Sequence, residues 1–177
     1  MQNKEVSTVD FYEELAVFLA CSDGNRRKNW AQKIIKDDVD IEFLSNLLLE
    51  DNKTANRFLW LLSDVGISNP LKLKKNLPFL YEFMKVNTPD FLSAFASYFL
   101  YVGVPEEMEG IAMNLMFQLL NSKEINQTLK ARASLVLFEL SKKFPEIKNE
   151  LIISLENQQD KYTNGFSKRV SKIVKNL

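Results

Sequence analysis

The sequence predicts an all-α protein in which about ten helices form antiparallel hairpins that stack on one another. Only 5 glycines and 5 prolines occur in 177 residues, whereas β-sandwiches and barrels need many more turn residues. Apolar residues recur at spacings of three and four, which is typical of amphipathic helices. No segment alternates apolar and polar residues between hairpin turns. We therefore expect a single helical-repeat domain over residues 1–177, with 166–177 as a terminal capping helix.

The first part of the chain is predicted to form five helices. Their ranges are Val9–Cys21, Asn25–Lys36, Asp40–Glu50, Lys53–Ile67 and Pro70 to about Val86. The first carries Phe11 and Leu15 on one face, and the third begins behind acidic residues that suit a helix N-terminus. The fourth is apolar around most of its circumference, so we expect it to be central and Trp60 to pack in the core. The fifth helix is open to a break at Pro78.

Proline and N-cap residues predict the starts of the later helices. Their ranges are Pro89–Val102, Pro105–Asn121, a helix after Ser122 that runs to about Phe144, Pro145–Gln158 and Phe166–Asn176. Proline suits the first helical position because the missing N–H has no intrahelical partner there. Ser122 is the expected N-cap of the eighth helix.

An internal echo suggests that one helix hairpin is used several times. A step of 75 residues pairs Arg57 with Arg132, Asp64 with Glu139 and Pro70 with Pro145. A weaker echo of 37 residues relates 65–67 to 102–104. These steps predict a repeat of about 37 residues in which each hairpin buries its apolar stripe against its neighbours. The alternative is an irregular helical bundle, since amphipathic helices share some apolar matches in any case.

The region 126–155 resembles a HEAT-type repeat. It carries Lys130-Ala131-Arg132-Ala133-Ser134-Leu135 and Leu137-Phe138-Glu139-Leu140, followed by Pro145 and by Leu151-Ile152. The region 55–83 matches less well. The resemblance implies antiparallel helix pairs in a short right-handed α-α superhelix.

Residues 158–169 are similar to the C-terminus of short bacterial HEAT-like proteins, some of which carry an adenylosuccinate lyase name. That lyase family uses histidine and a serine in a signature loop. This chain contains 0 histidines and no matching serine loop, so we expect no lyase activity.

The residue types of common active sites are missing or scattered. Without histidine the chain lacks the usual general base and the commonest metal ligand. Cys21 is the only cysteine, and no glycine-rich phosphate loop occurs. Asp38, Asp40 and Glu42 start like a calcium loop, but Phe43 and Leu49 stand where that loop needs Gly and Glu. We therefore predict no catalytic, cofactor-binding or metal-binding residues.

Clustered acids have a simpler interpretation. Glu106, Glu107 and Glu109 follow Pro105 at a helix start, where the helix dipole favours negative charge. A small enzyme that uses carboxylates or tyrosine stays a remote alternative, because no pair of groups with separate roles can be named.

Charge and hydropathy bound the expected partners and location. Lys and Arg total 23, as do Asp and Glu, so the formal net charge is zero, which disfavours a dedicated nucleic-acid binder. The longest uncharged stretch, 91–105, is too short to span a bilayer. Lys4, Glu5 and Asp10 interrupt the N-terminal segment, so no signal peptide is expected. We expect a cytoplasmic protein.

The predicted function is a non-catalytic scaffold or adaptor that binds a protein partner. The candidate partner-binding residues are Trp30, Arg57, Arg132, Lys168, Arg169 and Lys172. The competing interpretation of Trp30 and Trp60 is packing in the core. The competing interpretation of Arg57 and Arg132 is an ion pair with Asp64 or Glu139.

The alternative function is a nucleic-acid-binding repeat protein. The resemblance to HEAT-type repeats implies this alternative, because DNA glycosylases of the alkylation-repair type use HEAT-like repeats to bind a DNA duplex. In the last predicted helix, one apolar stripe is expected, made of Phe166, Val170, Ile173, Val174 and Leu177. Five positive residues and no acid occur in 161–177, which fits either an anionic surface contact or a soluble terminal cap.

Overall fold

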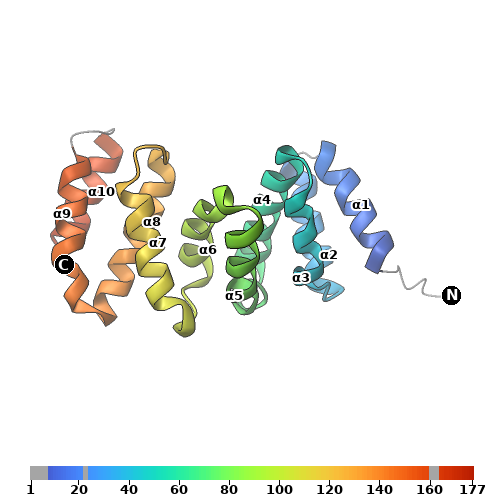
Figure 1. Ribbon diagram of the computed structural model, residues 1–177, viewed down its shortest axis with the longest axis horizontal. Helices are drawn as coiled ribbons and strands as arrows, with labels where there is room; N and C mark the ends of the chain where they lie inside the picture. The colour runs from blue at the N-terminus through green and yellow to red at the C-terminus, as the bar shows by residue number, and fades with distance from the viewer. Residues whose placement is uncertain (1–7, 22–23, 160–163) are drawn as a thin grey trace. The chain divides into compact units, whose positions relative to one another are not determined.

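A computed structural model describes residues 8–21, 24–159 and 164–177. Throughout these ranges the secondary structure is helical, with ten α-helices, several short 3₁₀ turns and no strand (Figure 1). The all-α prediction is therefore confirmed for the described residues. The chain divides into two compact units, Met1–Leu92 and Ser93–Leu177, and each is described by itself.

The first unit contains five α-helices with well-defined starts. Its elements are α1 (Thr8–Cys21), α2 (Gly24–Lys36), α3 (Ile41–Leu44), the 3₁₀ turn η1 (Ser45–Leu49), α4 (Asn52–Ser68) and α5 (Pro70–Asn87). Side-chain oxygens of Asp40, Asp51 and Asn69 accept hydrogen bonds from the first turns of α3, α4 and α5. Pro70 occupies the first turn of α5. These caps satisfy N–H groups that have no partner inside a helix.

Helix α5 is not broken at Pro78. Pro78 lies inside α5, and the helix continues on both sides of it to Asn87. Buried residues occur before and after the proline, among them Leu73 and Leu80. Packing of this buried face offsets the hydrogen bond that proline removes.

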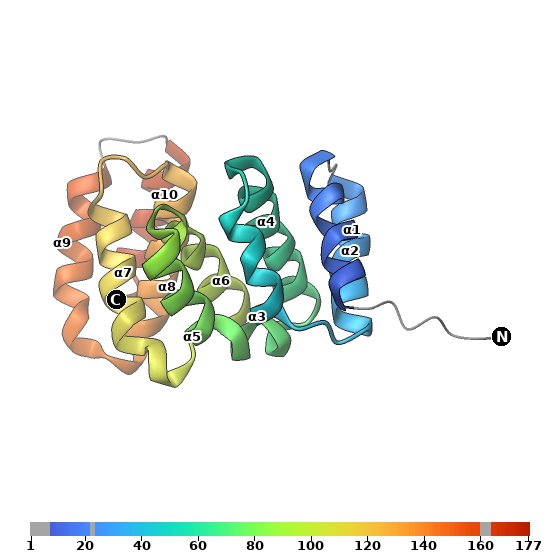
Figure 2. The same ribbon diagram turned by 45° about the vertical axis from the view of Figure 1, so that its right-hand side comes forward.

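Helix α4 is the centre of the first unit, as its apolar sequence predicted. It packs against α1, α2, α5 and η1. The side chains of Phe58 and Leu62 on α4 are fully buried, as are Leu15 of α1 and Ile34 of α2. Both views show α1 and α2 side by side (Figures 1 and 2). Burial of these side chains supplies most of the favourable free energy of this unit.

The second unit contains the remaining five α-helices. Its elements are η2 (Pro89–Ala94), which begins before the unit boundary, α6 (Phe95–Val102), η3 (Glu106–Met108), α7 (Glu109–Asn121), α8 (Gln127–Lys143), η4 (Pro145–Ile147), α9 (Lys148–Gln159) and α10 (Asn164–Val174). The segments that follow Thr88, Val104 and Phe144 begin with 3₁₀ turns where the sequence predicted α-helix. Such tight turns are frequent at helix ends.

The predicted N-cap of α8 is wrong. Ser122 precedes a turn, and its Oγ accepts a hydrogen bond from the N–H of Glu124 at 3.2 Å. The helix starts four residues later than expected, where Asn126 accepts from the N–H of Leu129 at 3.1 Å. Asn and Ser cap helices about equally well, so the cap position does not follow from the residue type alone.

Helix α8 is central to the second unit and packs against α6, α7, α9 and α10. Tyr98 and Leu137 are fully buried between these helices. The apolar stripe predicted for the last helix is also confirmed, because Phe166, Val170 and Ile173 are all buried. The basic residues of α10 consequently lie toward its exposed side.

Hydrogen bonds between the elements of each unit join residues 28 to 38 positions apart in sequence. Arg27 reaches Asp64 over 37 positions and Lys72 reaches Asp38 over 34 in the first unit. In the second, Arg132 reaches Ser97 over 35 and Lys143 reaches Glu109 over 34. Helices two apart in the chain also pack side by side, as α2 with α4 and α6 with α8 do.

Candidate interaction sites

A cleft in the second unit brings together two of the predicted residues, Arg132 of α8 and Arg169 of α10. It has a volume of about 620 Å³. Thr128 and Gln127 of the first turn of α8 add polar groups to its lining. Its apolar walls are Leu100, Ala131, Leu135 and Phe166. The cleft thus combines two guanidinium groups with apolar surface, and none of the described residues that line it is a carboxylate.

Arg132 is held in place by contacts with α6. Its Nη1 donates to the hydroxyl of Ser97 at 2.6 Å, and its guanidinium carbon lies 5.7 Å from the ring centre of Tyr101. Ser97 is buried and Arg132 is half-buried. A guanidinium has five N–H donors, so the Ser97 contact leaves most of them for a ligand.

Arg169 is exposed on α10, beyond the buried stripe of that helix. Within the described part of the chain, neither Arg169 nor Arg132 forms an ion pair with a carboxylate. Two unneutralised guanidinium groups at one cleft create a positive potential that attracts an anion.

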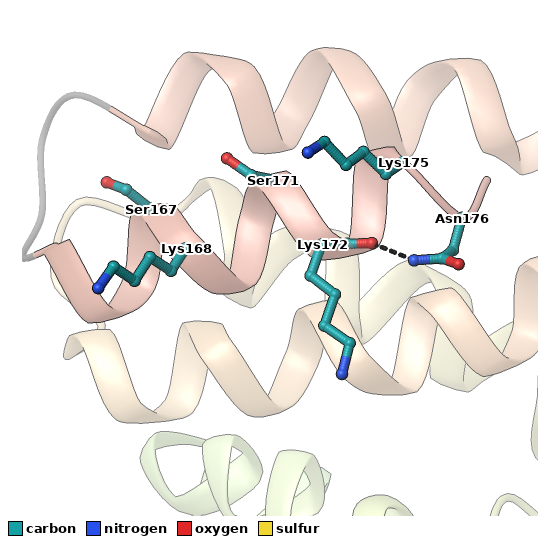
Figure 3. A pocket seen from close by; sticks show the side chains of 6 residues that line it. All are labelled: Ser167, Lys168, Ser171, Lys172, Lys175 and Asn176. Atoms are coloured by element: carbon teal, nitrogen blue, oxygen red, sulfur yellow. Dashed lines mark hydrogen bonds between the residues drawn. The ribbon is translucent and has the colours of Figure 1, made fainter.

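The other two basic candidates, Lys168 and Lys172, lie on the exposed side of α10. Together with Lys175 they line a hollow of about 450 Å³, whose remaining lining consists of Ser167, Ser171 and Asn176. Figure 3 shows Lys168 and Lys172 pointing to the same side of the helix, while Asn176 donates to the carbonyl of Lys172 at 2.6 Å. These three lysines, with Arg132 and Arg169, are called the basic surface of the second unit below.

Trp30, the first candidate in chain order, belongs to an aromatic cluster of the first unit. Its ring centre lies 5.3 Å from that of Phe11 and 5.6 Å from that of Phe18. The ammonium of Lys33 lies 4.3 Å from the Trp30 ring centre. The indole is half-buried, so it contributes to packing and also to the surface.

A cleft of about 670 Å³ adjoins this cluster. Val17, Phe18 and Trp30 form its apolar lining, and the exposed thiol of Cys21 is at its edge. Glu13, Glu14 and Arg26 supply both signs of charge around it. With two carboxylates and one cation, its lining carries a small negative formal charge.

Arg57 makes structural contacts that the sequence did not indicate. Its Nη1 donates to the carbonyl oxygens of Leu19 at 2.5 Å and Ala20 at 2.7 Å, at the end of α1. The alternative pairing of Arg57 with Asp64 does not form, because Asp64 binds the Nε of Arg27 at 2.5 Å. The alternative pairing of Arg132 with Glu139 does not form either, since Glu139 binds Lys142 at 2.7 Å and Arg132 binds Ser97.

The expectation that Trp60 is a core residue is wrong. Its side chain is 54% exposed, although Leu59 and Leu61 beside it are buried. At about 100° per residue, Trp60 lies nearly opposite Phe58 and Leu62 on α4. The sequence held a usable signal, because polar Asn56 and Ser63 occupy the same side of this helix as Trp60.

A cation covers the exposed indole. The guanidinium carbon of Arg27 lies 5.8 Å from the centre of the Trp60 ring, while its Nε binds Asp64. Asp64 follows Trp60 by one turn of α4, and Ile67, two turns after Trp60, is 61% exposed. Trp60, Arg27, Asp64 and Ile67 are called the Trp60 surface below.

The shifted pKa values of Asp51, Asp38, Tyr98 and Lys143 each have a structural cause. Hydrogen bonds from Thr54, as side chain and as backbone, hold the pKa of Asp51 below its usual range. The ammonium of Lys72 does the same for Asp38, at 2.6 Å. Burial raises the pKa of Tyr98. The hydrogen bond from Lys143 to Glu109 raises the pKa of that ammonium.

The acidic clusters noted in the sequence do not converge on a common point. Asp40 caps α3, Asp38 binds Lys72 and Glu109 binds Lys143. Among the described residues, no group of three His, Cys, Asp or Glu is arranged to hold a metal ion.

None of the helices in the described ranges is long and apolar enough to cross a membrane. The cytoplasmic location stays a prediction.

Comparison of the chain with protein-family models, with curated proteins and with solved structures found no match.

Proposed function

We propose that this protein is a non-catalytic helical-repeat adaptor that binds a protein partner through the Trp60 surface. The observation that carries the proposal is the 54% exposure of Trp60 on the helix that forms the centre of its unit. Tryptophan and arginine are the residue types that most often dominate the binding energy of protein interfaces. Here one of each is stacked on the other at the surface.

The Trp60 surface is ordered before a partner arrives. Arg27 is fixed between the carboxylate of Asp64 and the Trp60 ring. Side chains that already hold their bound conformation lose little entropy on association. An exposed apolar side chain, Ile67, extends the surface along the same helix. This combination favours burial against another protein.

The charge of the Trp60 surface also favours a protein partner. The carboxylate of Asp64 neutralises Arg27 at a distance of 2.5 Å. A nucleic-acid site needs uncompensated cations for phosphate groups, whereas the centres of protein interfaces are depleted of charge and enriched in aromatic residues and arginine.

A HEAT-like stack of hairpins is the arrangement we propose for the helices. Contacts between helices two apart in the chain, such as α2 with α4 and α6 with α8, support it, because stacking of neighbouring hairpins brings such helices together. Such stacks display one helix of each hairpin on a common binding surface.

Site-specific photo-crosslinking tests the proposed function. A benzophenone amino acid replaces Trp60 in one variant and Ile153 in another, since Ile153 is 60% exposed on the second unit and serves as the control. We expect one protein to be crosslinked in cells from position 60 and not from position 153. Purified wild-type protein should then bind that partner, and Trp60→Ala should weaken binding about 30-fold or more. Equal labelling from both positions, or unchanged affinity of Trp60→Ala, contradicts the proposal.

A nucleic-acid-binding function is the second candidate, and the basic surface of the second unit favours it. Five cations lie there, and the described residues that line its two hollows include no carboxylate. A salt titration with labelled duplex DNA tests it. Binding that weakens steeply with salt supports this function, whereas no measurable affinity at low ionic strength excludes it.

A further inference from the structure

We propose that the cleft between α8 and α10 of the second unit binds an acidic, partly apolar segment of a partner protein. Arg132 and Arg169 would hold a carboxylate of that segment, and Leu135 and Phe166 would contact an adjacent apolar side chain. The inference rests on the proposed function, because it assigns the chemistry of a protein partner, but it concerns a second site with residues of its own.

The charge of the cleft favours an anion. Two guanidinium groups line it, and among the described residues neither is paired with a carboxylate. A half-buried cation is partly removed from water, and an anionic ligand compensates for the lost hydration. The planar fork of arginine also matches the two oxygens of a carboxylate.

Two arginines of the first unit, Arg27 and Arg57, each donate to strong oxygen acceptors. Arg27 binds the carboxylate of Asp64, and Arg57 binds two carbonyl oxygens at the end of α1. Within the described part of the chain, Arg132, the sequence counterpart of Arg57, donates only to the neutral hydroxyl of Ser97. That contact and the Tyr101 ring orient the guanidinium while leaving its charge uncompensated.

The apolar walls favour a peptide over a nucleic acid. Leu135 and Phe166 lie beside the two arginines in a cleft of about 620 Å³. A peptide can place an apolar side chain next to a carboxylate, so it satisfies both kinds of lining. Tight binding of a nucleic acid draws on about 6–10 phosphate contacts, and this cleft supplies two cations.

The lysines on the exposed side of α10 have a separate role in this scheme. Lys168 and Lys172 do not line the cleft, so we expect them to attract the acidic segment without holding it. Charges at the rim of an interface act mainly on the association rate and on its salt dependence. Charges that contact the ligand act mainly on dissociation.

Fluorescence anisotropy of the full chain with labelled probes tests the proposal. The probes are a short peptide of alternating Glu and Leu, the same peptide with Gln for Glu, and a short duplex DNA. We expect the Glu peptide to bind at least tenfold more tightly than the Gln peptide, because charged hydrogen bonds are lost in the latter. Either equal affinities or no binding of the Glu peptide at millimolar concentration overturns the proposal.

Matched variants locate the site. Arg132→Gln and Arg169→Gln each remove one cation of the cleft, and Lys123→Gln removes an exposed cation of the same unit that lies outside it. Each arginine variant should bind the Glu peptide about tenfold more weakly, mainly through faster dissociation, and Lys123→Gln should change affinity less than about twofold. Arg132→Gln also loses the contact of Arg132 with Ser97. Arg169 is exposed, so Arg169→Gln still tests the cleft if Arg132→Gln unfolds.

Two further results separate the hypotheses. Trp60→Ala should leave binding of the Glu peptide unchanged, so failure at the Trp60 surface and failure at this cleft are distinguishable. Duplex DNA that binds more tightly than the Glu peptide, and that loses affinity in Arg169→Gln, overturns the proposal and assigns the cleft to nucleic acid.

Discussion

The guanidinium of Arg57 donates to the carbonyl oxygen of Leu19, 38 residues earlier in the chain, at 2.5 Å. The same nitrogen reaches Ala20 at 2.7 Å. The last carbonyls of a helix have no intrahelical partner, and a cation at this end is also favoured by the helix dipole. Arg57 therefore closes the C-terminal end of α1 and fastens it to α4.

Replacement of Arg57 should loosen α1. In Arg57→Gln the two carbonyls lose their charged donor, so we expect the free energy of unfolding to fall by about 1.5–3 kcal/mol. Amide hydrogen exchange in α1 should accelerate more than exchange in α5. Lys53→Gln, an exposed change on the same helix, is the control. If amide hydrogen exchange in α1 were equally fast in Arg57→Gln and in the wild type, the contact of Arg57 with the end of α1 would not stabilise that helix.

Two neighbouring aromatic residues on α4 should differ sharply in their effect on stability. Phe58 is fully buried, so Phe58→Ala should cost about 3–5 kcal/mol by loss of burial and creation of a cavity. Trp60 is 54% exposed, so Trp60→Ala should cost at most about 1 kcal/mol. Urea unfolding of both variants measures the difference. Similar losses in the two variants would mean that Trp60 packs in the core after all.

Replacement of Asn126 should lower the stability of the protein at the start of α8, whereas replacement of Ser122 should have little effect. Asn126→Ala removes the acceptor for the N–H of Leu129, and we expect a loss of about 1 kcal/mol. Ser122→Ala removes only a turn contact with Glu124 at 3.2 Å, so its effect should stay within about 0.5 kcal/mol. Thermal unfolding of the two variants decides between the caps, and the reverse order would place the helix start at Ser122.

Acid should weaken the cap of α4. Hydrogen bonds from Thr54 and Lys53 lower the pKa of Asp51 in the folded protein. Its stabilising contribution is therefore complete above the ordinary aspartate pKa of about 4 and is lost as the pH falls through the lowered folded value. Asp51→Asn keeps a capping side chain that does not titrate in this range.

Urea unfolding between pH 6 and pH 2.5 provides the measurement, and these values span the ordinary pKa of about 4. The wild type should lose its stability advantage over Asp51→Asn below pH 4, where Asp51 takes up its proton. A difference between the two proteins that is independent of pH would show that the carboxylate does not titrate differently in the folded state.

The positions of the helices could be read from the sequence because local interactions determine them. Proline at 70 and the capping side chains of Asp40 and Asn69 start helices within a residue or two of the predicted points. Apolar spacing correctly assigned Phe166 and Val170 to a buried stripe. These features depend on contacts within a few residues, so they do not need the rest of the fold.

The candidate sites were less predictable, because they depend on what each side chain meets on another helix. Arg57 and Arg132 look equivalent in sequence, yet one caps α1 and the other lines a cleft beside Ser97. Trp60 was misassigned because all five residues from Phe58 to Leu62 are apolar, which hides the period of the helix.

The sequence by itself therefore determined that this chain is helical, where most of its helices begin, and which stripe of the last helix is buried. Tertiary structure alone decided which charges are neutralised. Arg27 pairs with Asp64, 37 positions later in the chain, while Arg132 and Arg169 share a cleft whose described lining residues include no carboxylate. Helical periodicity is a local property of the backbone, whereas the neutralisation of a charge depends on partners that only folding brings within a few ångströms.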